Sequence, residues 1–185
     1  MMTSGIENSP TYAALLRGIN VGGKHKVPMS ALIELFMLAG CSAIRTYIQS
    51  GNVVFNAPPG ERAALAAMLM TSIEQQFGFS VAVILRVRAE IEQVLADNPW
   101  PGETVSDDQP YVVFLGDTPS AEQIATLDPQ RSPPDRFVCV GAHIYLLLPN
   151  GMARTKLTNV YFDSRLRTVS TIRNWRTVRQ LLTMF

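Results

Sequence analysis

The chain has 185 residues, of which 47% are apolar and 17% are charged, and its formal net charge is +1. This composition is typical of a folded globular protein and excludes an intrinsically disordered one. No apolar run approaches the roughly 20 residues that a membrane-spanning helix needs, and the first ten residues lack the pattern of a secretory signal. We therefore expect a cytoplasmic protein with no membrane partner, built as one domain or two small ones.

The first half of the chain alternates strand-like and helix-like patterns. We expect a strand at residues 11–18 and a helix at 28–40, where Pro28 suits the first helical position and Gly40 the end. Two strands then flank Ser50-Gly51, a pair typical of a tight hairpin. A helix, a strand and a trailing helix follow at residues 61–78, 80–87 and 88–99.

The second half repeats this order. The last expected helix places Trp175, Val178, Leu182 and Phe185 on one face, and Asn174 suits its N-cap. Gly141-Ala142 is the expected turn of a second hairpin. The expected elements are a strand at 111–117, a helix at 119–127, strands at 136–140 and 143–149, a helix at 151–166, a strand at 167–172 and a helix at 174–185.

Each half therefore has the order βαββαβ followed by a helix, which is the ferredoxin-like topology. We predict an α+β protein that is a tandem duplication of this unit, with two lobes of antiparallel sheet covered by helices. The first unit is expected at residues 1–100 and the second at 101–185. The two lobes can also pack as one compact domain.

Three motifs resemble the uncharacterised family known as domain of unknown function 1697 (DUF1697). They are RGINVGGKHKVPM, RTYIQSGNVVF and KLTNVYFDSRL…TIRNWRTVRQL, and the resemblance spans nearly the whole chain. It implies a two-lobed fold of the ferredoxin-like kind and a cytoplasmic protein of unknown activity. The family usually has Asn where this chain has His25, so the resemblance does not favour a catalytic role for this imidazole. It implies no established catalytic residues.

The loop after the first strand resembles a nucleotide-binding P-loop in part. From Gly18 the spacing G-x-x-x-x-G-K matches that motif up to Lys24, but His25 stands where a Ser or Thr hydroxyl would bind Mg²⁺. The helix of a P-loop also begins directly after the Lys, whereas here we expect it at Pro28. Nucleotide hydrolysis of the P-loop type is therefore disfavoured.

A simpler anion site at this loop remains our expectation. Gly22 and Gly23 let the backbone approach a ligand closely, and Lys24 and Lys26 supply positive charge. Val27 lies at the expected N-cap position, where it has no side-chain oxygen to bind the first amides of the helix. A solvated basic loop is the alternative.

The charge distribution extends this candidate site to the carboxyl-terminal part. Residues 11–56 carry a net charge of +3 and residues 151–185 one of +6, whereas residues 57–150 carry −7. A basic surface forms if the two basic segments meet. The full candidate ligand-binding set is Arg17, Asn20, Gly22, Gly23, Lys24, Lys26, Gln49, Ser50, Asn52, Lys156 and Arg173. Turn chemistry is the alternative explanation for the hairpin residues.

No metal, cofactor or catalytic group is predicted. Cys41 and Cys139 lie far apart in or beside apolar stretches, which indicates buried free thiols. Together with His25 and His143 they do not form a recognisable metal-ligand spacing. No Ser-His-Asp or Cys-His arrangement is favoured either, so the sequence leaves open whether the protein is an enzyme.

The sequence is compatible with three functions. The one we favour is a small-molecule-binding protein with a phosphate or carboxylate site. The first alternative is an interaction or scaffolding module, because exposed sheet edges invite pairing and a monomer and a homodimer are both compatible with the sequence. The second is single-stranded RNA binding, which is disfavoured because the strand at 52–56 lacks the RNA-recognition pattern and Phe55 is expected to face the core.

Overall fold

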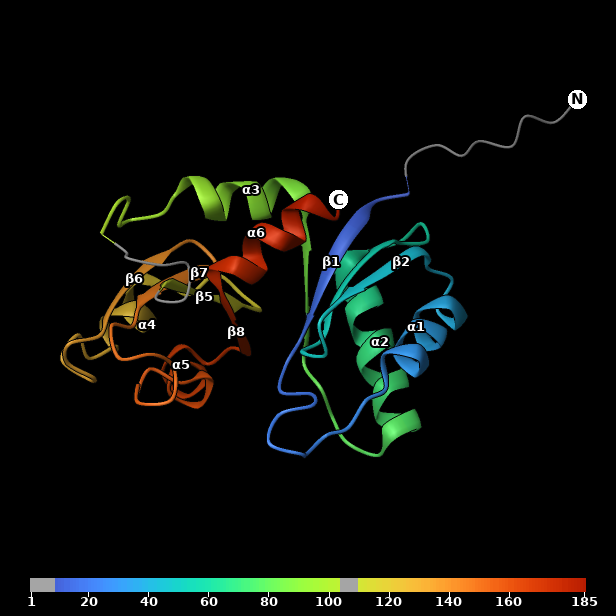
Figure 1. Ribbon diagram of the computed structural model, residues 1–185, viewed down its shortest axis with the longest axis horizontal. Helices are drawn as coiled ribbons and strands as arrows, with labels where there is room; N and C mark the ends of the chain where they lie inside the picture. The colour runs from blue at the N-terminus through green and yellow to red at the C-terminus, as the bar shows by residue number, and fades with distance from the viewer. Residues whose placement is uncertain (1–8, 104–109) are drawn as a thin grey trace, which may run out of the picture. The chain divides into compact units, whose positions relative to one another are not determined.

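The computed structural model describes residues 9–103 and 110–185 and divides into two units (Figure 1). The first unit spans Met1–Arg88 together with Met184–Phe185, and the second spans Ala89–Thr183. Each unit contains one four-stranded antiparallel sheet with helices. The predicted α+β class with two antiparallel sheets is confirmed.

The helices and strands alternate as the sequence pattern predicts. The first unit contains β1 (Thr11–Leu16), α1 (Met29–Leu38), β2 (Ser42–Tyr47), β3 (Asn52–Asn56), α2 (Arg62–Phe77) and β4 (Val83–Val87). Helix α3 (Arg88–Ala96) begins at the boundary. The second unit continues with β5 (Pro110–Leu115), α4 (Ala121–Ala125), β6 (Arg136–Val140), β7 (His143–Leu147), α5 (Asn159–Leu166), β8 (Ser170–Asn174) and α6 (Trp175–Thr183).

The two sheets have the same topology. Their strand orders are β2-β3-β1-β4 and β6-β7-β5-β8, and all neighbouring strands are antiparallel. The registers correspond as well, since Ala13 pairs with Arg86 in the first sheet and Val112 with Arg173 in the second. This is the ferredoxin-like order, in which each helix crosses over the sheet to connect two strands.

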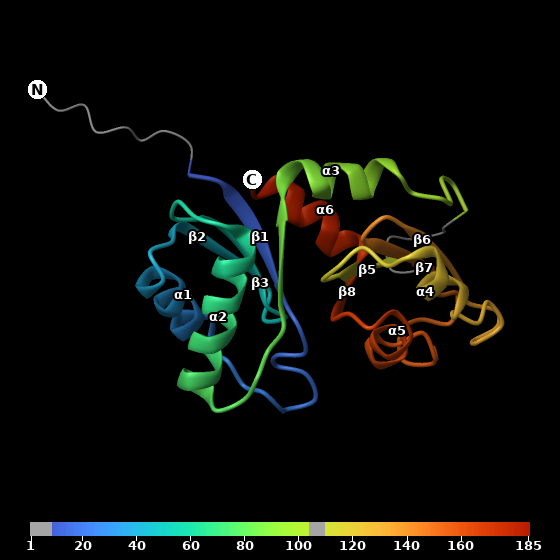
Figure 2. The ribbon, with the colours of Figure 1, turned by 180° about the vertical axis from the view of Figure 1, so that it is seen from behind.

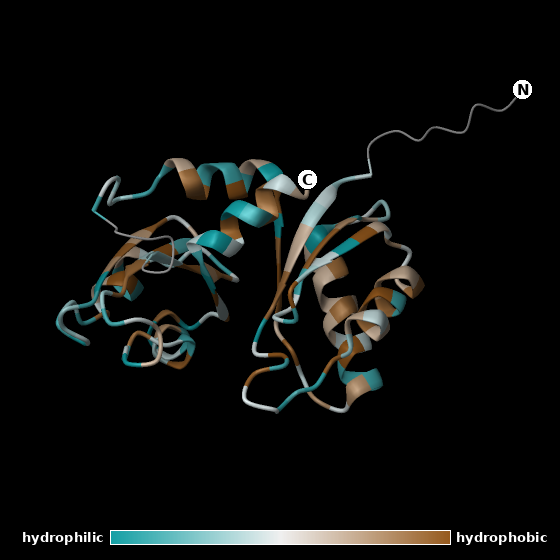
Figure 3. Cartoon of the chain, in the orientation of Figure 1, coloured by the Kyte–Doolittle hydropathy of each residue, from teal (hydrophilic) through white to brown (hydrophobic). Residues whose placement is uncertain are grey.

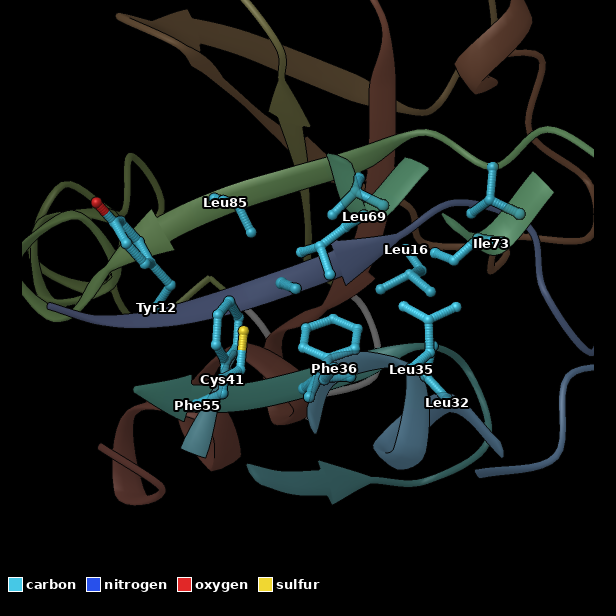
Figure 4. Packing of buried hydrophobic residues seen from close by; sticks show 14 of the residues in the cluster. Tyr12, Leu16, Leu32, Leu35, Phe36, Cys41, Phe55, Leu69, Ile73 and Leu85 are labelled. Atoms are coloured by element: carbon cyan, nitrogen blue, oxygen red, sulfur yellow. The ribbon is translucent and has the colours of Figure 1, made fainter. Parts of the chain in front are cut away.

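The core of the first unit lies between its sheet and helices α1 and α2, which lie side by side (Figures 1 and 2). Alternate residues of β1, namely Tyr12, Ala14 and Leu16, face this core because strand side chains alternate between two faces (Figure 4). Phe36 of α1 meets Phe55 of β3 edge to face at 4.9 Å between ring centroids. Phe55 therefore faces the core, as expected.

Both helices bury one face against the sheet, and hydrophobic and hydrophilic residues alternate along α2 (Figure 3). Leu32 and Leu35 of α1 and Leu69 and Ile73 of α2 are buried against the sheet. Full burial of such side chains stabilises the fold by about 1.5–3 kcal/mol each. No helix in the described part of the chain is long and apolar enough to cross a bilayer.

The second unit packs α5 against one face of its sheet and α6 against β5 and β8. On α6 the buried stripe contains Trp175, Val178 and Leu181, whereas Leu182, placed in the stripe by the sequence pattern, is partly exposed. The buried residues of this stripe are therefore spaced three apart, from Trp175 to Val178 and from Val178 to Leu181. Asn174 caps α6 as expected, because its Oδ1 accepts a hydrogen bond from the Thr177 amide at 2.8 Å.

The helix predicted at residues 151–166 is half its expected length. Helix α5 begins at Asn159, and the Thr158 hydroxyl caps it by accepting a hydrogen bond from the Tyr161 amide at 3.3 Å. Residues 151–158 are not helical and contain a turn at 152–154. A Thr side chain is favoured at an N-cap, because its hydroxyl accepts a hydrogen bond from an amide of the first helical turn that has no partner within the helix. Thr158 is therefore the local signal for this later start.

Candidate functional site

The loop between β1 and α1 folds back on itself as a small hairpin. Val21 and Lys24 form an isolated bridge, and the Lys24 amide donates to the Val21 carbonyl at 3.0 Å. Gly22 and Gly23 have φ values of 58° and 74°. Positive φ at both central residues is the requirement of a type I′ turn. The Gly-Gly pair is therefore explained by turn geometry, and the partial P-loop spacing does not produce a P-loop.

Asn20 closes the base of this loop. Its Nδ2 donates to the carbonyls of Val27 (3.0 Å) and Gln49 (2.8 Å), and its Oδ1 accepts from the Val27 amide (2.9 Å). Its backbone amide also donates to the His25 carbonyl at 3.0 Å. Asn20 thus ties the loop to the entrance of α1 and to the β2–β3 hairpin, and its side chain is used structurally.

His25 anchors the other side of the loop. Its ring stacks on Phe79 at 4.5 Å between centroids with an interplanar angle of 25°, and its Nδ1 lies 3.3 Å from the Gly18 carbonyl oxygen. Its backbone has a φ of 49°, which costs energy for a residue with a Cβ. These contacts give His25 a packing role.

The β2–β3 hairpin has a four-residue loop, since Tyr47 pairs with Asn52. Strand β2 therefore ends at Tyr47, two residues before Gln49, where the sequence pattern places the end of the strand. Asn52 is fully buried, and its Nδ2 donates to the Tyr47 carbonyl (3.2 Å) and to the Ser50 hydroxyl (2.9 Å). Asn52 and Ser50 thus stabilise the turn, whereas Gln49 is exposed near its tip.

Gly51 lets this hairpin approach the end of β1. A Cβ at Gly51 would lie 2.6 Å from the Cβ of Leu16 and 3.0 Å from Cδ1 of Ile19, and its φ is 75°. The Leu16 amide donates to the Gly51 carbonyl at 2.8 Å. The hairpin is therefore fixed beside the loop that Asn20 closes, which brings Gln49 close to it.

A pocket of about 310 Å³ lies where this hairpin, the loop and the start of α1 meet. Four of its lining residues belong to the predicted set: Asn20, Gly23, Lys26 and Gln49. Val27, Pro28 and Met29 complete the lining.

The helix end at this pocket lacks the usual side-chain cap. The N-cap residue is Pro28 rather than the expected Val27, and no side chain caps the helix. The first turn of α1 also has no acidic residue. Because the N-terminus of a helix carries partial positive charge and free amides, this end of α1 favours a negatively charged group.

Lys26 provides the full charge at the pocket. Its side chain is exposed, and among the described residues its ammonium has no hydrogen bond or ion pair. The other predicted residues of this region, Gly22, Lys24, Ser50 and Asn52, do not line the pocket. Arg17 does not line it either; its backbone amide donates to the Ala82 carbonyl at 2.9 Å.

The last two predicted residues belong to the second unit. Arg173 on β8 is 7% exposed, and its Nη1 donates to the Thr171 hydroxyl (2.7 Å) and to the Ile172 carbonyl (2.8 Å). Burial lowers the pKa of Arg173 to about 10. Lys156 is exposed in the segment before α5, where its backbone amide donates to the Ser132 hydroxyl at 3.0 Å. The buried and hydrogen-bonded side chain of Arg173 thus has a structural role.

The sequence predicts the loop, the hairpin and a start of α1 without a side-chain cap, but it places the N-cap at Val27 and leaves Val27, Pro28 and Met29 out of the candidate set. These three residues line the pocket because they form the entrance of α1, and not through polar side chains. Pro28 directly before the apolar helical pattern is the local signal for the missing cap, because a Pro side chain cannot accept a capping hydrogen bond.

No curated protein matches this chain. Its fold matches the structure of the conserved bacterial protein SP0830 from Streptococcus pneumoniae, with a TM-score of 0.71 and 24% sequence identity over 95% of this chain and 98% of that chain. The model of the protein family of unknown function DUF1697 matches residues 10–145, which include every residue of the pocket. The chain belongs to the DUF1697 family.

Proposed function

We propose that the protein binds a small anionic molecule, a phosphate or a carboxylate, in the pocket at the start of α1. The observation that carries this proposal is the combination of Lys26 with an α1 N-terminus that has neither a side-chain cap nor an acidic residue. Two independent sources of positive potential thus meet in one hollow.

The pocket is better suited to binding than to catalysis. Its lining, as far as the structure describes it, contains no carboxylate, thiol, hydroxyl or imidazole. Lys26 would neutralise the ligand, the amides at the start of α1 would donate to it, and the Gln49 carboxamide would select its orientation. A volume of about 310 Å³ is at the small end for ligand pockets, which favours a metabolite with a single acidic group.

Removal of the Lys26 charge tests the proposal. Thermal unfolding is followed with increasing inorganic phosphate, and then with small phosphorylated and carboxylated metabolites. A ligand at about 100 times its Kd should add roughly 2.7 kcal/mol to the free energy of unfolding.

The Lys26→Gln variant should lose most of this stabilisation. The matched variant Lys24→Gln, with the same charge removed at the turn outside the pocket, should lose much less. Equal losses of stabilisation in the two variants would mean that the anion is attracted by the basic loop in general and not bound at a specific site. The absence of stabilisation by any of the compounds would refute the proposal.

Two features of the chain support the wider proposal of a cytoplasmic protein made of duplicated units. Cys41 and Cys139 are free thiols, as is usual in a reducing compartment. The two sheets share strand order and register, which is the expected result of tandem duplication. RNA binding gains no support from strand β3, because Phe55 is fully buried and packs on Phe36.

A further inference from the structure

The first unit carries a partly apolar groove at the other end of α1, with Ser72, Gln75 and Gln76 as the polar residues of its larger hollow. Two adjoining hollows of about 370 and 270 Å³ share Ala39 and Met68 in their linings and so form one continuous groove between α1 and α2. It extends from Gln76 on α2 to Pro58 and Pro59 before that helix. Helix α1 has ten residues and is therefore about 15 Å long, which separates this groove from the anion pocket at its start.

The walls of the groove expose large apolar side chains. Leu38 at the end of α1 is 88% exposed, and Met68 on α2 is 41% exposed. Single exposed apolar residues are common on protein surfaces, but neighbouring ones that line one groove indicate an interaction site. Methionine adds adaptability, because its unbranched thioether can follow the shape of different apolar partners.

Glu61 is the single charged side chain among the residues described as the lining of the groove, so the lining carries one negative charge. Glu34 is exposed one helical turn before Leu38. The last turn of α1, which ends at the groove, contains no basic residue that would offset these carboxylates.

We propose that this groove binds an apolar segment of a partner protein that is flanked by lysines or arginines, most simply one face of an amphipathic helix. The apolar part of the groove would take the Leu, Met or Phe side chains of the segment, and the carboxylates of Glu61 and Glu34 would attract its basic flanks. The inference does not depend on the anion pocket, because it concerns different residues and a ligand of opposite charge.

A pair of designed peptides tests this on the full chain. Each has about 14 residues, which is roughly four helical turns, with leucines on one face. The other face carries lysines in one peptide and glutamates in its partner peptide. Fluorescence anisotropy should show saturable binding of the lysine peptide and no binding of the glutamate peptide.

Surface variants then locate the binding site. Leu38→Ser and Met68→Ser should each weaken binding of the lysine peptide about tenfold or more, and Glu61→Gln should weaken it and reduce its salt dependence. The matched control Met70→Ser should bind as the parent does, because Met70 is similarly exposed on α2 but lies outside the groove.

Four outcomes would overturn the inference. The first two are equal binding of both peptides and an equal loss of binding in the Met70→Ser variant. A dimer in light scattering that Leu38→Ser dissociates would assign the groove to a second copy of the chain. Binding to phosphatidylserine-containing vesicles that Leu38→Ser abolishes would assign it to a lipid surface.

Discussion

Asn20 pairs with the backbone of Val27 in both directions, with its Oδ1 accepting at 2.9 Å and its Nδ2 donating at 3.0 Å. The side chain thereby makes with Val27 the two backbone hydrogen bonds that a neighbouring strand would make, and it closes the loop directly before α1. Because the same Nδ2 also binds the Gln49 carbonyl, one carboxamide sets the relative positions of the loop, the hairpin and the helix. The pocket that we propose as the ligand site depends on this arrangement.

Replacement of Asn20 should therefore destabilise the first unit. Asn20→Ala removes three side-chain hydrogen bonds and places an alanine at a φ of 55°. The expected loss in the free energy of unfolding is about 2–3 kcal/mol, measured by urea denaturation. Asn20→Gly tolerates the positive φ and should recover about 1 kcal/mol of it. A loss below about 0.5 kcal/mol in Asn20→Ala would show that the bonds contribute little.

Gly51 and Gly22 provide a matched comparison of space and backbone conformation. Both have positive φ, but a Cβ at Gly51 would lie 2.6 Å from Leu16, whereas one at Gly22 meets no atom within 4 Å. Gly22→Ala should cost about 1 kcal/mol from conformation alone. Gly51→Ala should cost about 3 kcal/mol, since overpacking adds to that term. Equal losses in urea denaturation would mean that the hairpin moves away from β1 at little cost.

The cysteines predict a fall in stability at alkaline pH. Burial raises the pKa of Cys41 and of Cys139 to about 11, from an ordinary value of 9.0. Below pH 9 both thiols are neutral in the folded and unfolded chain, so their contribution is fully present. Between about pH 9 and 11 the unfolded chain ionises first, and the stability should fall as the pH rises.

Urea denaturation at about pH 8 and about pH 10.5 measures this change. In Cys41→Val the fall over this interval should be smaller, because one ionising group has been removed. An unchanged fall in this variant would exclude Cys41 as a contributor. Iodoacetamide should also react slowly with both folded thiols near pH 8, since the thiolate is the reactive form.

The strand and helix order followed from periodicity, because alternate apolar residues in β1 and β3 and helical spacing in α1 and α2 all report the same buried face. Helix starts were less predictable. The sequence at residues 151–158 is compatible with a helix, and the capping hydrogen bond that Thr158 accepts from the Tyr161 amide decides the start of α5. For α6 the sequence pattern places Leu182 in the buried stripe, whereas Leu181 is the buried residue. Leu181 and Leu182 are adjacent leucines, and a spacing of three or of four residues after Val178 is equally compatible with a helix.

The candidate site was predictable in part. Basic and glycine residues in the loop drew attention to the region, and four predicted residues do line the pocket. Their roles were not predictable, because those roles depend on tertiary contacts. The three hydrogen bonds of Asn20, the stacking of His25 on Phe79 and the burial of Asn52 each join segments whose approach no local pattern specifies.

The most direct test of the proposed anion site is a phosphate titration of the isotopically labelled chain, followed by amide chemical shifts. Binding at the start of α1 predicts saturable shifts at Gly23, Lys26, Met29 and Gln49, with the groove residue Leu38 unaffected. In Lys26→Gln these shifts should require much higher phosphate concentrations. Shifts that never saturate, or that spread over all basic residues alike, would contradict a specific site at this helix end.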